Sequence, residues 1–178
     1  IVRILLLHAV SVSMPSLFFL YYGDEIGKLN DYSYKNSPEI ANDTRYLQRG
    51  YFNWKSTRLI EDDENSYQSR IFEGIKKITA TRIGCPFFTQ NKKTLLLKSY
   101  SIDIYNEDHV SGKELQEDHT LLIFKRFRFD DNYILFIFNF CRYQRPVNIP
   151  DVNGKFKDLL SNEILEINDE FKIKAYGY

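Results

Sequence analysis

Asp24 and Glu25 stand side by side after an apolar run and are the first candidates for acid–base chemistry in this sequence. Cleavage of a glycosidic bond uses two carboxyl groups that lie about 5.5 Å apart for retention or ~6.5–9.5 Å apart for inversion. Neighbours in an extended chain project to opposite faces, so this pair is not expected to converge on one bond. At most one carboxylate should face a pocket, and the other should cap or pair within its own loop.

A second polar group follows, formed by Asp31, Asp43, Arg45 and Arg49. An arginine fixed by a carboxylate gives a rigid, bidentate wall that suits the recognition of hydroxyl-rich ligands. The same four residue types are equally typical of an ordinary exposed loop. Their spacing alone therefore leaves both interpretations open.

Metal and cofactor chemistry has no comparable pattern. His8, His109 and His119 are scattered without ligand spacing, and Cys85 and Cys141 form no redox or zinc motif. Phosphate-binding glycine loops and nucleophile elbows do not occur either. We therefore expect no metal and no cofactor. The sparse cysteines favour a reducing cytoplasm, while a single disulfide between them and secretion remain open alternatives.

Composition narrows the class of protein. The chain has 178 residues with 24 Lys+Arg against 24 Asp+Glu, which allows one domain or a small domain plus part of another. A net charge of +0 argues against a dedicated nucleic-acid binder. Hydrophobic residues at 43% exclude a disordered tail.

The first 22 residues form an apolar segment that has the length of a membrane helix. Arg3, His8 and Pro15 interrupt it, so we expect no membrane span. The apolar spacing instead predicts a helix that ends near Ser13, before the proline.

A continuous apolar run over 17–22 then predicts a strand closed by Gly23. A strand that is apolar on both faces is typical of a buried parallel sheet, so helix and strand together indicate one step of an α/β protein. The long polar stretch 23–65 is predicted to be a functional loop. After it, 66–83 should form an amphipathic helix that ends at Gly84. The apolar face of that helix is expected to contain Ile71, Phe72, Ile75, Ile78 and Ile83.

Strand-like patterns dominate after Pro86. Long strands are predicted at 94–104, 120–129 and 133–140, the last two joined as a hairpin at 130–132. Shorter strands are predicted at 145–149, 156–159, 163–167 and 171–173, and 106–118 is predicted to be a solvated loop. These patterns favour an antiparallel β-sandwich. The predicted organisation is a first part at 1–84 and a β domain at 85–178.

Several segments resemble the α-amylase family, glycoside hydrolase family 13, and within it the amylosucrases and sucrose hydrolases. The resemblance rests on Leu20-Tyr21-Tyr22-Gly23-Asp24-Glu25-Ile26-Gly27, Asn30-Asp31-Tyr32-Ser33-Tyr34, Asn42-Asp43-Thr44-Arg45-Tyr46 with Arg49, Phe52-Asn53-Trp54, Ser69-Arg70-Ile71-Phe72-Glu73-Gly74-Ile75, Thr120-Leu121-Leu122-Ile123-Phe124-Lys125-Arg126, Ile134-Leu135-Phe136-Ile137-Phe138-Asn139-Phe140 and Asp158-Leu159-Leu160. Two departures stand out: Gln48-Arg49-Gly50 replaces the usual His-Arg-Pro, and Tyr46 replaces a tryptophan.

The resemblance implies a fold and an incomplete site. The fold would be α/β plus all-β: the last αβα segment of a (β/α)8 barrel (strand 8, loop 8 and helix 8) at 1–84, followed by the antiparallel β-sandwich domain at 85–178. Arg49 would close the sugar pocket, with Asp31 and Tyr32 as lining residues. The family's catalytic carboxylates follow strands four, five and seven, which would all precede Ile1, so no catalytic residue is assigned and the chain alone is expected to be inactive.

The sequence therefore leaves two functions open. In the first, the chain is the C-terminal part of an enzyme that acts on sucrose or α-glucans by double displacement, with the N-terminal barrel portion as its missing partner. In the second, it is a non-catalytic carbohydrate-binding or interaction module derived from such a protein. A related accessory subunit of a transporter would need a membrane anchor, which the sequence does not indicate.

Overall fold

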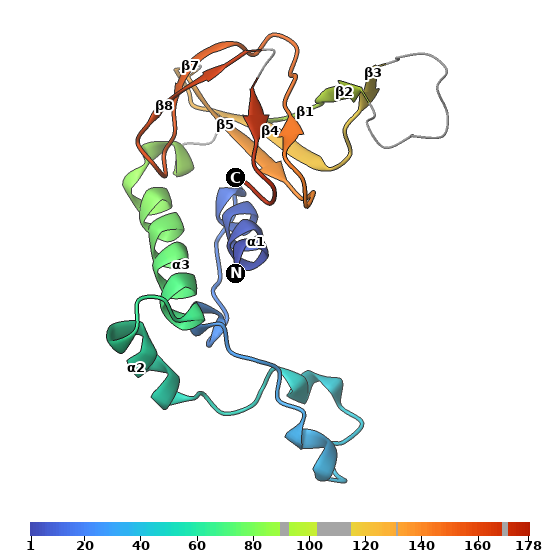
Figure 1. Ribbon diagram of the computed structural model, residues 1–178, viewed down its shortest axis with the longest axis vertical. Coiled ribbons are helices and arrows are strands. Elements are labelled where there is room, and N and C mark those ends of the chain that lie inside the picture. The colour runs from blue at the N-terminus through green and yellow to red at the C-terminus, as the bar shows by residue number, and fades with distance from the viewer. Residues whose placement is uncertain (90–92, 103–114, 131, 169–170) are drawn as a thin grey trace. The chain divides into compact units, whose positions relative to one another are not determined.

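The computed structural model describes residues 1–89, 93–102, 115–130, 132–168 and 171–178 (Figure 1). The chain divides into two compact units. The first comprises Ile1 and 17–76, and the second comprises 2–16 and 77–178. Within the described residues, no helix is both long enough and apolar enough to cross a bilayer.

The described residues contain three α-helices: α1 at Val2–Ser13, α2 at Trp54–Asp62 and α3 at Tyr67–Gly84. The predictions for the first and third are confirmed. Ile71, Ile75 and Ile78 of α3 are buried as expected, whereas Ile83 is 85% exposed, so its assignment to the apolar face was wrong. Helix α2 was not expected, because it lies in the polar stretch 23–65 that was predicted to be a loop. None of its residues is buried.

The predicted buried strand at 17–22 is not formed. Leu17 and Phe19 are each 82% exposed, and these residues have no strand assignment. The physical reason is the absence of a partner: residues 17–76, all of which the structure describes, contain short 3-10 turns and helices but no second strand. A parallel strand needs neighbours that satisfy its backbone groups, and apolar composition does not supply them.

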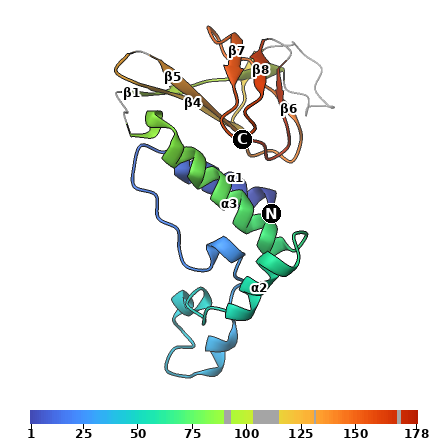
Figure 2. The same cartoon turned by 90° about the vertical axis from the view of Figure 1, so that its left-hand side faces the viewer.

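The strands that the structure describes in the second unit are all paired in antiparallel orientation. The largest sheet has the order β1-β4-β5, with β1 at Lys93–Leu97, β4 at Leu121–Phe127 and β5 at Tyr133–Asn139. The two-stranded pairs are β2 at Tyr100–Ile102 with β3 at Leu115–Glu117, β6 at Arg145–Pro146 with β9 at Lys172–Ile173, and β7 at Gly154–Lys157 with β8 at Ile164–Ile167. Figure 2 shows β7 beside β8. The strands predicted at 120–129, 133–140, 145–149, 156–159, 163–167 and 171–173 are confirmed as strand regions, with different bounds. The single strand predicted at 94–104 is instead two strands, β1 and β2, which belong to different sheets, and residues 103 and 104 fall outside the described part of the chain. Strand β3 lies in the predicted loop 106–118, whose residues 106–114 fall outside the described part of the chain.

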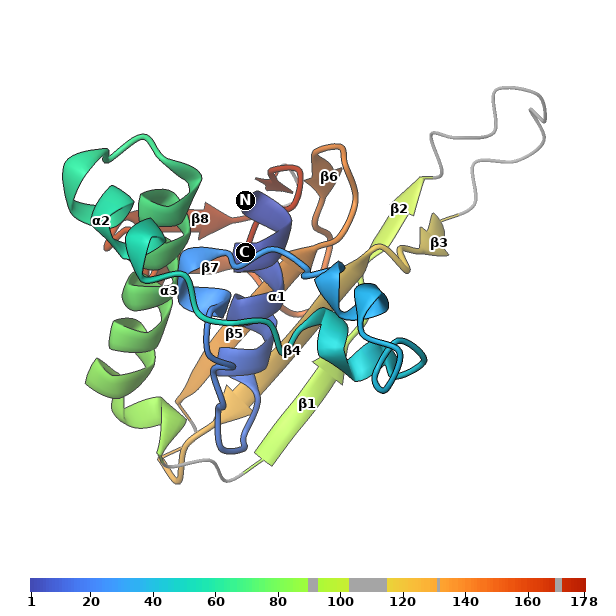
Figure 3. The same cartoon turned by 90° about the horizontal axis from the view of Figure 1, so that it is seen from below.

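The β1-β4-β5 sheet buries residues on both of its faces. One face of β4 places Ile123 in a core with Val147, Ile149, Val152 and Ile167. On the opposite face, Phe124 stacks on Phe136 with 4.8 Å between ring centroids, and helix α1 lies against this side of the sheet (Figure 3). This double burial explains why the strand sequence is apolar at successive positions rather than alternating.

Two arginines donate hydrogen bonds to carbonyl groups at the C-terminal end of α1. Arg126, which is only 2% exposed, donates from Nη1 to the Ser13 carbonyl over 2.8 Å. Arg82 donates to the carbonyls of Val12, Met14 and Ser16. The last carbonyls of a helix have no partner within the helix and carry partial negative charge, so both cations stabilise this end.

The architecture is thus mixed α/β, with three helices in the first half followed by small antiparallel sheets. The described residues do not form a closed barrel.

Candidate functional site

The loop 23–53 of the first unit folds back on itself around Lys28. The Lys28 ammonium donates to the Tyr22 hydroxyl and to the Gln48 carbonyl, each over 3.3 Å, and to the carbonyl of Gly50. Tyr22 also donates its hydroxyl proton to the Gly50 carbonyl over 3.0 Å. The Lys28 ammonium lies 4.5 Å from the centre of the Tyr22 ring, a favourable cation–π distance. One side chain therefore ties the start of the loop to its end.

Asp31 lies against the segment that contains Arg49. The Asp31 amide donates to the Leu47 carbonyl over 2.8 Å, and a Cβ placed on Gly50 would come within 2.5 Å of Asp31 Oδ2. Position 50 thus needs a glycine for this close approach. A hydrogen bond from Ser33 is the main cause that lowers the pKa of the Asp31 carboxyl, so Asp31 is an anion at neutral pH.

Arg49 and Tyr32 are both exposed. The Arg49 guanidinium lies 5.8 Å from the centre of the Tyr46 ring and forms no ion pair with Asp31 or Asp43. The Tyr32 side chain is 59% exposed, and the Lys35 ammonium lies 5.7 Å from the centre of its ring. The structure therefore brings the backbone segments around Asp31 and Arg49 together.

The arginine that a carboxylate holds is Arg45. Its Nε donates to Asp43 Oδ1 over 2.8 Å, and its Nη2 donates to Asp43 Oδ2 over 2.6 Å. The side-chain hydrogen bond from Arg45 is the largest cause that lowers the pKa of Asp43 to about 2, and the charge of Arg49 adds to it. The rigid arginine expected from the sequence is thus present at position 45.

Asp24 and Glu25 do not lie in extended chain. Asp24–Ile26 forms a 3-10 turn, which corrects the expectation that the two side chains alternate along a strand. Glu25 Oε2 accepts a hydrogen bond from the Gly23 amide over 2.8 Å. The prediction that one of these carboxylates caps its own loop is confirmed.

An exposed row of aromatic rings borders the loop, formed by Tyr21, Tyr22, Phe52 and Trp54. Successive ring centroids are 4.8, 6.4 and 4.7 Å apart. Trp54 is 75% exposed, and both tyrosines are more than 40% exposed. The sequence analysis did not identify this aromatic row. The signal was the clustering of aromatic residues at both ends of one polar loop.

Metal-ligating side chains do not gather in groups of three or more within the described ranges, which leave out His109. Cys85 and Cys141 are free thiols, so the disulfide alternative does not apply to this structure.

No model of a known protein family matches this chain.

Proposed function

We propose that this chain is the C-terminal part of an amylosucrase-like glucosyltransferase or glycoside hydrolase of the α-amylase family, acting on sucrose or α-glucans. The observation that carries the proposal is the folding of loop 23–53, which holds Asp31 against Gly50, the neighbour of Arg49, beside the aromatic row. Anions, guanidinium groups and exposed rings at one place suit a ligand that has many hydroxyl groups and apolar C–H faces.

The exposed segment 17–22 supports the same proposal. Its apolar side chains would be buried if it were a barrel strand paired with strands from the N-terminal barrel portion. In such an enzyme the catalytic carboxylates of the double displacement would come from that portion. Arg49 would then close the sugar pocket by pairing with an acidic residue outside this chain, with Asp31 and Tyr32 lining the pocket.

The test is to read the DNA upstream of the Ile1 codon and to express the complete reading frame. We expect an in-frame barrel, release of glucose or fructose from sucrose by the complete protein, and no release by the 178-residue chain. Arg49→Ala should lower kcat/KM at least about tenfold, the loss expected when one charge-assisted hydrogen bond is removed. The matched control is Arg58→Ala, which removes an exposed arginine of α2. Either a stop codon directly upstream, or hydrolysis of α-glucans without any action on sucrose, would refute the proposal that the complete protein acts on sucrose.

The aromatic row favours a second candidate function, that of a non-catalytic carbohydrate-binding module. Exposed rings can bind glucans without any catalytic carboxylate. If this holds, the 178-residue chain alone should be retarded in a native gel that contains amylose. Trp54→Ala should abolish the retardation, whereas Phe129→Ala, which removes a 73% exposed ring from the second unit, should not. Equal mobility of all three chains with and without amylose would exclude this function.

A further inference from the structure

Lys28 holds the chain on both sides of Arg49. Its ammonium donates to the carbonyl of Gln48 over 3.3 Å and to the carbonyl of Gly50. It also donates to the Tyr22 hydroxyl over 3.3 Å. A lysine ammonium has three donor protons, so these three acceptors match its capacity. The residue before Arg49 and the residue after it are therefore bound to one cation.

The stem of Lys28 is held by its packing against Gly23. Gly23 is buried with a φ of 94°, and a Cβ at this position would come within 2.8 Å of Lys28 Cδ. The Gly23 carbonyl also accepts from the Lys28 amide over 2.8 Å. Because the lysine is fixed at its backbone and along its stem, its ammonium is directed at the segment that contains Arg49.

A second set of contacts orders the same segment. The Asp31 amide donates to the Leu47 carbonyl over 2.8 Å, and the Arg49 amide donates to the Tyr46 carbonyl over 3.1 Å. The Arg49 side chain nevertheless stays exposed. An exposed arginine on an ordered backbone is preorganised, because little further entropy is lost when its guanidinium binds an acidic group or a ligand.

We infer that Lys28 is the positioning residue for Arg49: by fixing the carbonyls of Gln48 and Gly50, it sets the direction in which the Arg49 side chain leaves the loop. All of these residues belong to the first unit. The effect on catalysis rests on the proposed function, whereas the order that Lys28 gives to segment 46–50 is a property of the 178-residue chain alone.

Trypsin measures that order, because cleavage after Arg49 requires the surrounding backbone to leave its hydrogen bonds. Lys28→Met keeps the stem and removes the ammonium. It should raise the initial rate of cleavage after Arg49 at least about tenfold, since two charge-assisted hydrogen bonds to carbonyls are lost. Lys28→Arg should restore part of the protection, because a guanidinium can still donate to carbonyls. Cleavage after Arg142, an exposed arginine of the second unit, is the internal reference and should not change.

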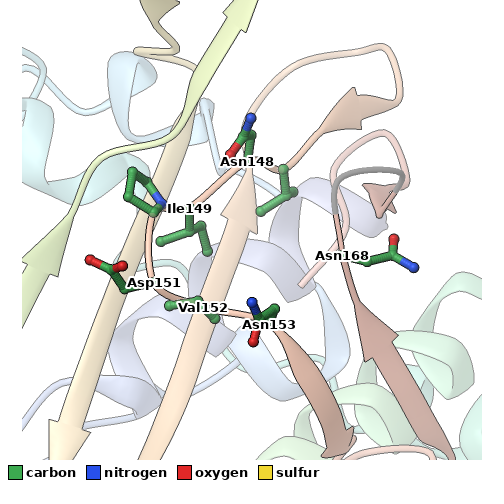
Figure 4. A pocket seen from close by; sticks show the side chains of 8 residues that line it. Asn148, Ile149, Asp151, Val152, Asn153 and Asn168 are labelled. Atoms are coloured by element: carbon green, nitrogen blue, oxygen red, sulfur yellow. The ribbon is translucent and has the colours of Figure 1, made fainter.

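Two control variants show whether the effect belongs to Lys28. Lys35→Met removes an exposed lysine of the same loop, whose ammonium lies 5.7 Å from the centre of the Tyr32 ring. Asn153→Ala removes an exposed polar side chain of the second unit, where Asn153 lines a small hollow (Figure 4). Both variants should keep the parental rate of cleavage after Arg49.

In the complete protein, the test is a double-mutant cycle on sucrose turnover. Lys28→Met should lower kcat/KM at least about fivefold in the parent protein but less than about twofold in the Arg49→Ala background, because no side chain is left there to position. A merely structural role of Lys28 would lower kcat/KM by the same factor in both backgrounds.

Three outcomes would overturn the inference: an unchanged rate of cleavage after Arg49 in Lys28→Met, a rise after Arg142 that equals the rise after Arg49, or equal losses of kcat/KM in the two backgrounds. An equal rise in Lys35→Met would also overturn it. The failure of the proposed function looks different, since a complete protein without action on sucrose would still show faster cleavage after Arg49 in Lys28→Met.

Discussion

Asp43 illustrates how one arginine lowers the pKa of a loop carboxyl group. Arg45 is 71% exposed at its side chain, yet its bidentate contact holds the pKa of Asp43 at about 2. The geometry arises locally, because Asp43 also accepts a hydrogen bond from the Arg45 amide over 3.1 Å and so caps the 3-10 turn Thr44–Leu47. The pair therefore gives the loop a fixed anion and cation two residues apart.

Arg45→Met should raise the pKa of Asp43 toward the ordinary aspartate value of about 3.9, because the largest cause of the depression is removed. Carbon-13 NMR of the carboxyl group during an acid titration measures this directly. Arg49→Met is the matched comparison and should produce a smaller rise, since the charge of Arg49 is the weakest of the causes that lower this pKa. An unchanged Asp43 pKa in the Arg45 variant would contradict the bidentate contact.

The second unit also depends on single residues at the ends of elements. Helix α1 ends at Ser13, and the Ser13 carbonyl meets the buried guanidinium of Arg126 on the neighbouring strand β4. Arg126 also donates to the Phe88 carbonyl over 3.3 Å. Burial, and then the charge of Arg82, lower the pKa of Arg126, but an arginine remains charged at any ordinary pH. A strand side chain thus helps to cap the C-terminal end of α1.

Arg126→Met should lower the free energy of unfolding by about 2 kcal/mol, because a variant of similar length leaves buried carbonyls without a donor. Urea unfolding followed by far-UV circular dichroism measures the change. Arg70→Met, which removes an exposed arginine of α3, should stay within about 0.5 kcal/mol of the parent chain. Equal losses in the two variants would show that Arg126 does not serve as the cap of α1.

The elements differ in how far the sequence could predict them. Helices α1 and α3 and strands β4 and β5 carry their own periodicity or strand propensity, so local patterns sufficed. The segment 17–22 carries an equally strong strand pattern, but its state depends on partner strands that residues 17–76 do not contain. Helix α2 begins at an Asn53 cap, whose side chain accepts from the Lys55 amide over 3.1 Å, but it lies in a stretch whose overall polarity indicated a loop.

The candidate site likewise has some features that the sequence could predict and others that it could not. Asp31 and Arg49 could be named from residue type, and the backbone does bring their segments together. Which arginine pairs with which carboxylate could not be predicted, because Arg45 and Arg49 are chemically identical and only the turn at Thr44–Leu47 selects Arg45. The role of Arg126 could not be predicted for a related reason. The sequence of a strand does not indicate that one of its arginines caps a helix more than a hundred residues earlier.

At the scale of the whole molecule, one buried ion pair joins distant parts of the second unit. Asp118 Oδ2 accepts from Arg145 Nε over 2.7 Å, and Asp118 Oδ1 accepts from the Thr120 amide over 2.9 Å. The side chains are 1% and 7% exposed for Asp118 and Arg145, respectively. Burial alone would raise the pKa of Asp118, but the hydrogen bonds from Thr120 and then Arg145 outweigh it and lower that pKa.

Asp118→Asn should lower the free energy of unfolding at pH 7 by about 3 kcal/mol, because it leaves the Arg145 charge buried and unpaired. Since the pKa of Asp118 is lower in the folded state than the unfolded value of about 3.9, the carboxylate contributes its full stability above that value and loses it as the pH falls through the folded value. The parent chain should therefore lose stability in acid more steeply than the variant.

Urea unfolding at several pH values tests this prediction. The unfolding is monitored by NMR of Ile123 and Val147, because the sole tryptophan, Trp54, lies in the other unit. Glu163→Gln, which removes an exposed carboxyl group of the same unit, should keep the parental slope, and parallel acid profiles for the parent and Asp118→Asn would refute the linkage.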